Sequence, residues 1–166
     1  SEWESKLKAI VSVVKNEDVG SMTGVPSWMM VLLQRTLADT GKQTISEIWP
    51  NLEVFFHGGI SFKPYREQYR KIIGKDINYY EIYNASEGFF AIQDQPGSDE
   101  MLLMLDYGIF YEFIPMDAFD PDNLQAIPLE EVEIGKNYAL VITTNSGLWR
   151  YLIGDTVKFT SLHPYR

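Results

Sequence analysis

The sequence predicts an α/β fold in which a parallel strand–helix–strand first half is followed by an antiparallel, β-rich second half. In the first half, apolar residues recur at helical spacing, and two short apolar runs flank an amphipathic stretch. After Gly88 the pattern changes to short apolar runs divided by turn-forming residues.

Length and composition describe one globular domain. The 166 residues, 45% of them hydrophobic, are enough to bury one sizeable core. We expect residues 1–166 to be a single piece of a larger domain, with an α/β part at 1–88 and a β-rich part at 89–166. Ser1 opens directly on a helical pattern and Arg166 follows a strand-like run, which indicates an internal fragment of a longer protein.

The charge balance and the missing cysteines exclude several classes of partner and site. A net charge of −9 argues against a nucleic acid or a membrane as the main partner, because both favour a basic face. A chain without cysteine has no disulfide and no cysteine-based metal site. No apolar run approaches the roughly 20 residues that span a bilayer, and no signal peptide opens the chain, so we expect a cytoplasmic protein. The sequence gives no indication of oligomeric state.

Apolar spacing and capping signals place the elements of the first half. The stretch from Gly20 to Pro26 is predicted as loop, and Thr44 with Glu47 forms a capping-box pattern. The predicted elements are helices over 2–16 and 26–41, a short turn over 44–47, a strand over 52–57, a helix over 62–73 and a strand over 77–83. A strand–helix–strand unit of this length normally pairs its strands in parallel, with ligands at their carboxyl ends. We therefore expect Gly58-Gly59 and Ser86-Glu87 to lie near one another.

The second half is predicted as a series of short strands. Turn signals separate them at residues 95–97, 106–108, 120–123 and 145–147. The predicted strands cover 89–92, 101–105, 109–114, 138–144, 148–153 and 157–160. Residues 129–134 fit either a helical turn or an edge strand.

Three stretches could carry chemistry, and each also has a purely structural interpretation. Gly58 and Gly59 could let bare backbone approach a flat ligand, or could form a tight turn that needs positive φ. Tyr83, Ser86 and Glu87 could supply a stacking ring, a hydroxyl and a cation ligand, or could be a core aromatic, a turn former and a solvated charge.

The third stretch is Gly154-Asp155, which follows the predicted strand 148–153. An aspartate at a tight turn could accept hydrogen bonds from the vicinal hydroxyls of a ribose. Glycine and aspartate are also the favoured residues of an ordinary hairpin turn.

In combination, Gly-Gly-Ile at 58–60, Tyr-Asn-Ala-Ser-Glu at 83–87 and Tyr-Leu-Ile-Gly-Asp at 151–155 resemble the adenylate-forming superfamily. The chain is most similar to its auxin-responsive acyl-acid amido synthetases, whose pattern is Tyr-Ala-Ser-Ser-Glu followed by Tyr-Arg-Val-Gly-Asp. The local sequences of residues 48–52 and 86–90 also resemble those of bacterial members. The likeness spans most of this chain but only the middle of such a protein. It implies that the α/β and β-rich halves are part of the large N-terminal domain of an adenylate-forming enzyme.

The resemblance implies a site for ATP. The backbone around Gly58, Gly59 and Ile60 would line the adenine, and Tyr83 would pack against its ring. Asp155 would bind the ribose hydroxyls.

The resemblance also implies groups for the phosphates and the acid. Ser86 would contact the α-phosphate and Glu87 would hold Mg²⁺, so these two are the expected catalytic residues. Asn84 and Phe89 would form part of the acyl pocket. Asn84-Ala85 stands where plant members have Ala-Ser, at a position facing the activated carboxylate, and Leu152 stands where the family usually has arginine.

By this resemblance the full-length protein is an ATP-dependent ligase. It would join a carboxylic acid to ATP as an acyl-adenylate and transfer the acyl group to an amine such as an amino acid. The family's phosphate loop would lie before Ser1 and its lysine-bearing small domain after Arg166, so we expect the fragment alone to be inactive.

Two other functions remain open from the sequence. Ser86, with glycine two residues later, has half of the nucleophile-elbow pattern of serine hydrolases, and His57 and His163 are the available bases. The elbow requires a following helix, whereas residues 89–92 are predicted as a strand. The other alternative is a non-catalytic binding or scaffold module whose aromatic residues serve only as core.

Overall fold

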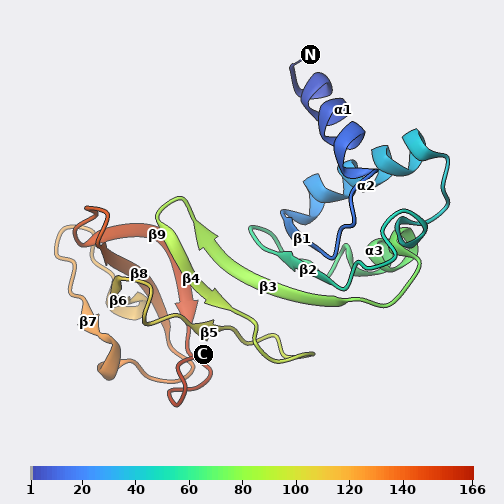
Figure 1. Cartoon of the computed structure of the whole chain (residues 1–166). Coiled ribbons are helices and arrows are strands. Elements are labelled where there is room, and N and C mark those ends of the chain that lie inside the picture. The colour runs from blue at the N-terminus through green and yellow to red at the C-terminus, as the bar shows by residue number, and fades with distance from the viewer. Residues whose placement is uncertain (1) are drawn as a thin grey trace. The chain divides into compact units, whose positions relative to one another are not determined.

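The computed structural model describes residues 2–166 and shows two compact units, the first ending at Ile82 and the second beginning at Tyr83 (Figure 1). Strand β3 (Asn78–Ala85) begins in the first unit and ends in the second. No helix within the described residues is long and apolar enough to cross a membrane.

The first unit combines helices with parallel strands, as the sequence predicts. Strand β2 (Val54–His57) pairs in parallel with β3 on one side and with β1 (Ser21–Gly24) on the other. The helical elements are α1 (Glu2–Val14), α2 (Pro26–Thr40), the 3₁₀ turn η1 (Ile45–Glu47) and α3 (Arg66–Ile73). The residues at the centre of its core are Leu33, Ile45, Leu52, Phe55, Tyr69 and Ile73, all fully buried.

Helix ends follow the predicted punctuation. Gly41 after α2 and Gly74 after α3 adopt left-handed φ values of 69° and 79°, and the N–H of each donates to a carbonyl of the preceding turn. Thr44 and Glu47 form the predicted capping box at η1.

The predicted loop over Gly20–Pro26 is wrong in part, because Ser21–Gly24 is strand β1. Of its four residues only Thr23 has one of the β-branched or aromatic side chains that mark a strand in sequence. The strand forms through register with β2, where Met22 lies opposite Phe55 and is buried. Tertiary pairing therefore decides the conformation of this segment.

The two glycines after β2 are required for different reasons. Gly59 has a φ of 80°, which confirms the structural interpretation of a turn needing positive φ. At Gly58, a Cβ atom would lie 2.4 Å from the carbonyl oxygen of Ile82 on β3. Gly58 thus permits a backbone approach that no other residue would allow.

His57 is a buried histidine inside an aromatic cluster. Its side chain is 3% exposed, its ring stacks on Phe62 with centroids 4.2 Å apart, and Phe55 lies 5.6 Å away. Its Nδ1 atom is buried with no hydrogen-bond partner among residues 2–166. Burial, and to a lesser extent the nearby Arg66 guanidinium, lowers the pKa of His57 from 6.5 to about 4, so the imidazole is neutral at pH 7.

The second unit is built from antiparallel strands. Strand β4 (Gly88–Ile92) pairs with β5 (Leu102–Leu103), and a four-stranded sheet has the order β7-β6-β8-β9. Its strands are β6 (Ile109–Pro115), β7 (Ile127–Pro128), β8 (Asn137–Thr144) and β9 (Tyr151–Lys158). Two 3₁₀ turns, η2 (Met116–Ala118) and η3 (Leu129–Glu131), lie between them in sequence. The largest fully buried side chains of this unit's main cluster are Phe90, Phe113, Tyr138, Leu140 and Ile142.

The predicted division into strands 148–153 and 157–160 is wrong, because Tyr151–Lys158 is one strand, β9. Gly154-Asp155 is consequently a β-bulge and not a hairpin turn. Ala139 of β8 pairs with Thr156 and Val141 pairs with Leu152, so three residues of β9 lie opposite one of β8. Gly154 has a φ of 92°, which lets the strand absorb the extra residues without ending.

We expect Gly58→Ala to destabilise the protein by at least about 2 kcal/mol, because the added methyl group overlaps the backbone of β3. Gly20→Ala is the matched control, since its Cβ would lie 3.7 Å from the Asn51 carbonyl oxygen, an ordinary contact. Urea denaturation of both variants measures the effect. Equal stability of the two variants would show that β2 and β3 do not approach so closely.

We expect the stability of the protein to fall on acidification partly through His57. Between pH 6.5 and about 4 the unfolded histidine binds a proton that the folded one does not, so stability is lost as the pH falls through this window. Relative to His57→Phe, the wild type should lose on the order of 2 kcal/mol of unfolding free energy from pH 7 to 4.5. Urea denaturation of both proteins at several pH values measures the unfolding free energies. The difference between wild type and His57→Phe should stay constant from pH 7 to 8. Unfolding free energies that change in parallel with pH over the whole range would contradict a neutral, buried His57.

Candidate functional site

The segment from Tyr83 to Gly88 forms a tight hairpin between β3 and β4. Ser86 and Glu87 are its two turn residues, with Ser86 exposed and Glu87 half-buried. Neither side chain forms a hydrogen bond or an ion pair with another residue of the range 2–166. Their oxygen atoms are therefore available to a ligand.

Tyr83 is held by the core of the second unit. Its half-buried ring packs against Phe90 with centroids 4.9 Å apart and borders a small apolar cavity of about 80 Å³. Burial raises the pKa of the Tyr83 phenol, and the Asp155 carboxylate raises it further. Part of the core-aromatic interpretation is thus correct, but the hydroxyl group has a specific partner.

That partner is Asp155. The Tyr83 hydroxyl donates to Oδ2 of Asp155 at 2.7 Å, joining residues 72 positions apart in the sequence. Asp155 is exposed and lies on the bulge of β9, directly after Gly154. The structure therefore brings together two of the residues for which the family resemblance implies nucleotide contacts.

Arg150, just before β9, is a feature that the sequence analysis missed. It has a φ of 46°, uncommon for a residue with a side chain, and its N–H donates to Thr143 Oγ1 at 3.0 Å. Its Nε and Nη2 atoms each lie 3.0 Å from a carboxylate oxygen of Glu112 on β6. This bidentate contact fixes the start of the strand that carries Asp155. Nothing in the local sequence distinguishes Arg150 from a solvated surface arginine.

Asn84 and Phe89 lie away from the Tyr83 contact. Side chains alternate along a strand, so Asn84 and Phe89 face the side opposite to Tyr83 and Phe90. Asn84 is exposed, and the half-buried Phe89 ring lies 5.8 Å from that of Tyr107. Such a face can contact a ligand distinct from one that reaches Asp155.

The predicted adenine-lining residues belong to the first unit. Gly58 is buried, whereas Gly59 is exposed and Ile60 is 38% exposed, so the turn after β2 presents backbone and one apolar side chain at the surface. Strands β2 and β3 pair in parallel, with His57 opposite Glu81, which confirms the pairing predicted for this strand–helix–strand unit.

Glu87 suits a cation that is bound partly by the protein and partly by the phosphates of a ligand. Among residues 2–166 no three histidine or acidic side chains cluster closely enough to form a metal site by themselves. Mg²⁺ commonly binds one or two carboxylates together with substrate phosphates and water. Glu87, half-buried and without an ion pair in the described chain, suits that mode of binding.

Ser86 is not a nucleophile elbow. That motif needs a sharp strand-to-helix turn, whereas Ser86 is followed by strand β4. The serine hydrolase alternative therefore lacks its central geometric requirement.

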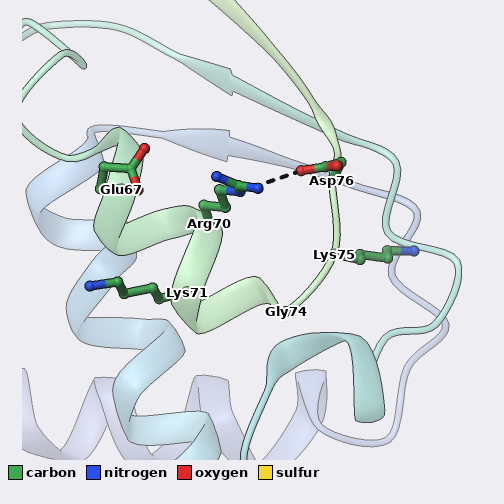
Figure 2. Close-up of a pocket in the computed structure, with 6 residues that line it drawn as sticks. All are labelled: Glu67, Arg70, Lys71, Gly74, Lys75 and Asp76. Carbon is green, nitrogen blue, oxygen red and sulfur yellow. Dashed lines mark ion pairs between the residues drawn. The ribbon is translucent and has the colours of Figure 1, made fainter.

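A larger pocket of about 430 Å³ lies at the end of α3 in the first unit (Figure 2). Charged residues line it, including an Arg70–Asp76 pair with 3.7 Å between Nε and Oδ1. Figure 2 shows Lys71 and Lys75 pointing in opposite directions. The pocket also lies at a helix C-terminus, whose dipole disfavours anions. It therefore offers no convergent cations to a phosphate group, and none of the predicted site residues line it.

Sequence relatives and solved structures both resemble this chain over most of its length. Indole-3-acetic acid-amido synthetase GH3.4 of Arabidopsis thaliana is 33% identical over 129 residues, covering 72% of this chain and 21% of that protein. Jasmonoyl–L-amino acid synthetase JAR4 of Nicotiana attenuata is 32% identical over 129 residues, covering 72% of this chain and 22% of that protein. The chain thus spans about a fifth of the length of these curated relatives.

Among solved structures, the AtGH3.15 acyl acid amido synthetase in complex with 2,4-DB superposes with a TM-score of 0.69 at 15% identity, covering 93% of this chain and 36% of that one. A 2-hydroxyisobutyryl-CoA ligase in complex with 2-HIB-AMP and CoA gives 0.64 at 18% identity, with coverages of 93% and 32%. These similarities confirm the predicted fold, that of the N-terminal domain of adenylate-forming enzymes.

Two domain families match successive parts of the chain. The GH3 family N-terminal domain matches residues 1–77, and the GH3 family central domain matches residues 102–165. The two matches follow one another in order and together cover most of the sequence. The chain belongs to the GH3 family.

Proposed function

We propose that this chain is part of a longer acyl-acid amido synthetase, an ATP-dependent ligase. The observation that carries the proposal is the ordered match to two GH3 domains, with relatives named as indole-3-acetic acid-amido and jasmonoyl–L-amino acid synthetases. The same proposal includes a cytoplasmic location. It also includes membership of the bacterial branch, which the local sequences of residues 48–52 and 86–90 support.

The proposed reaction has two steps. A carboxylate oxygen of the acid attacks the α-phosphorus of ATP. The bond from the α-phosphorus to the oxygen that bridges the α- and β-phosphates breaks, and pyrophosphate leaves with the electron pair of that bond. The nitrogen of an amine or amino acid then attacks the carbonyl carbon of the acyl-adenylate and loses a proton, giving an amide and AMP. The first step brings two anions together, so their repulsion must be offset.

Few cations of the second unit are free to offset this repulsion. Arg150, Arg166 and Lys136 are each paired with a carboxylate of the same unit, and of this unit's described lysines and arginines only Lys158, exposed on β9, has no ion pair. Mg²⁺ held by Glu87 and the phosphates would supply the missing positive charge. The hydroxyl of Ser86, in the same turn, would donate to the α-phosphate.

The remaining roles are those that the family resemblance implies. Asp155 would accept hydrogen bonds from the ribose hydroxyls, and Tyr83 beside it would face the adenine. The exposed backbone at Gly59 and Ile60, with Gly58 before it, would line the adenine. Asn84 and Phe89, on the opposite side of the hairpin, would contribute to the acyl pocket.

We expect Asp155→Ala to weaken the use of ATP by roughly 1.5–3 kcal/mol, because hydrogen bonds to a charged group are lost. The measurement is acid-dependent ATP–pyrophosphate exchange by the full-length protein. Asp122→Ala, which removes another exposed aspartate of the second unit, is the matched control.

Glu87→Gln should raise the Mg²⁺ concentration required for half-maximal ATP–pyrophosphate exchange, because the variant loses the carboxylate proposed to hold the ion.

Unchanged exchange in Asp155→Ala would refute the assignment of the ribose site. Absence of exchange in the wild type with every acid tested, together with a melting temperature that MgATP does not change, would favour a non-catalytic binding module.

A further inference from the structure

The hydrogen bond from Tyr83 to Asp155 links two residues whose proposed tasks differ, one at the base and one at the ribose. Its 2.7 Å length is that of a good O–H···O bond to a carboxylate. Both residues belong to the second unit, so the contact lies within one compact body.

The two ends of this bond are fixed to different extents. The Tyr83 ring is packed against Phe90 and belongs to the main apolar cluster of the unit. Asp155 is exposed and follows a glycine with a φ of 92°, and Tyr83 is the only partner of its side chain among residues 2–166. An exposed aspartate on a bulge otherwise samples several side-chain rotamers. The phenol therefore determines the orientation of the carboxylate.

The hydrogen bond also leaves the carboxylate able to bind more donors. An ionised aspartate has about four lone-pair positions, and the phenol occupies one of them on Oδ2. Burial keeps the Tyr83 phenol protonated well above neutral pH, so it acts only as a donor toward Asp155 under ordinary conditions. Oδ1 and the second position on Oδ2 remain for other hydroxyl groups.

We propose that Tyr83 is a positioning residue for ribose recognition, whose hydroxyl orients the Asp155 carboxylate toward the vicinal 2′- and 3′-hydroxyls of the nucleotide. This inference rests on the proposed function and adds a task to Tyr83 that is separate from packing against the base. The hydroxyl can be removed while the ring stays, so the two tasks can be measured separately.

The test compares Tyr83→Phe with the wild type in ATP–pyrophosphate exchange by the full-length protein, using ATP and 2′-deoxy-ATP as substrates. We expect kcat/KM for ATP to fall about tenfold, mainly through KM, because the carboxylate loses its orientation. Use of 2′-deoxy-ATP should fall less, so the preference for ATP shrinks. In Asp155→Ala the preference should already be reduced, and adding Tyr83→Phe should reduce it no further.

Tyr111→Phe is the matched control. Its hydroxyl donates to the Met104 carbonyl oxygen at 2.9 Å, and its ring belongs to the same apolar cluster as Tyr83. The variant removes a tyrosine hydroxyl from the same core without touching Asp155. We expect its preference for ATP over 2′-deoxy-ATP to equal that of the wild type.

A second measurement reads the contact without any activity. In protein labelled with ¹³C at tyrosine Cζ, the resonance lost in Tyr83→Phe identifies Tyr83, and that resonance should move in Asp155→Asn. A Tyr83 resonance that does not respond to the substitution overturns the inference.

The kinetic outcomes separate the inference from the proposed function. Normal exchange in the wild type, with equal losses for both nucleotides in Tyr83→Phe, overturns the positioning role and leaves the ligase assignment intact. No exchange by the wild type with any acid overturns the proposed function, and the ribose role with it.

Discussion

The carboxylate of Asp155 is held by a tyrosine whose own position is set by a hydrophobic core. Tyr83 packs on Phe90 at the end of β3, and its hydroxyl reaches the bulge of β9. The bulge in turn depends on Gly154, and the start of β9 depends on the pairing of Arg150 with Glu112. A polar group at the surface is thereby oriented by apolar packing and by the positive-φ glycine of the bulge.

Local sequence was sufficient wherever one residue type has one strong conformational preference. Gly41 and Gly74 end helices where they were expected, and the Thr44–Glu47 capping box forms as its spacing predicts. Apolar runs and apolar periodicity likewise placed the helices and most strands of both units. Most elements bury one face, and β8 is buried on both faces and appears in the sequence as a continuous apolar run.

The sequence misled where tertiary contacts outweigh local preference. Strand β1 (Ser21–Gly24) has little strand propensity and forms through its register with β2. Gly154-Asp155 has the composition of a turn, yet the pairing of β9 with β8 continues on either side of it. The Tyr83–Asp155 contact spans 72 positions, and no local pattern encodes such a distance.

The central claim is that the full-length protein activates an acid as an adenylate, and the identity of the nucleotide product tests it most directly. The protein is incubated with Mg²⁺, ATP, an amino acid and a panel of carboxylic acids, and the nucleotides are separated by chromatography. The proposed function predicts AMP and pyrophosphate, formed only when a suitable acid is present. Formation of ADP and phosphate, or of AMP regardless of the acid, would contradict it.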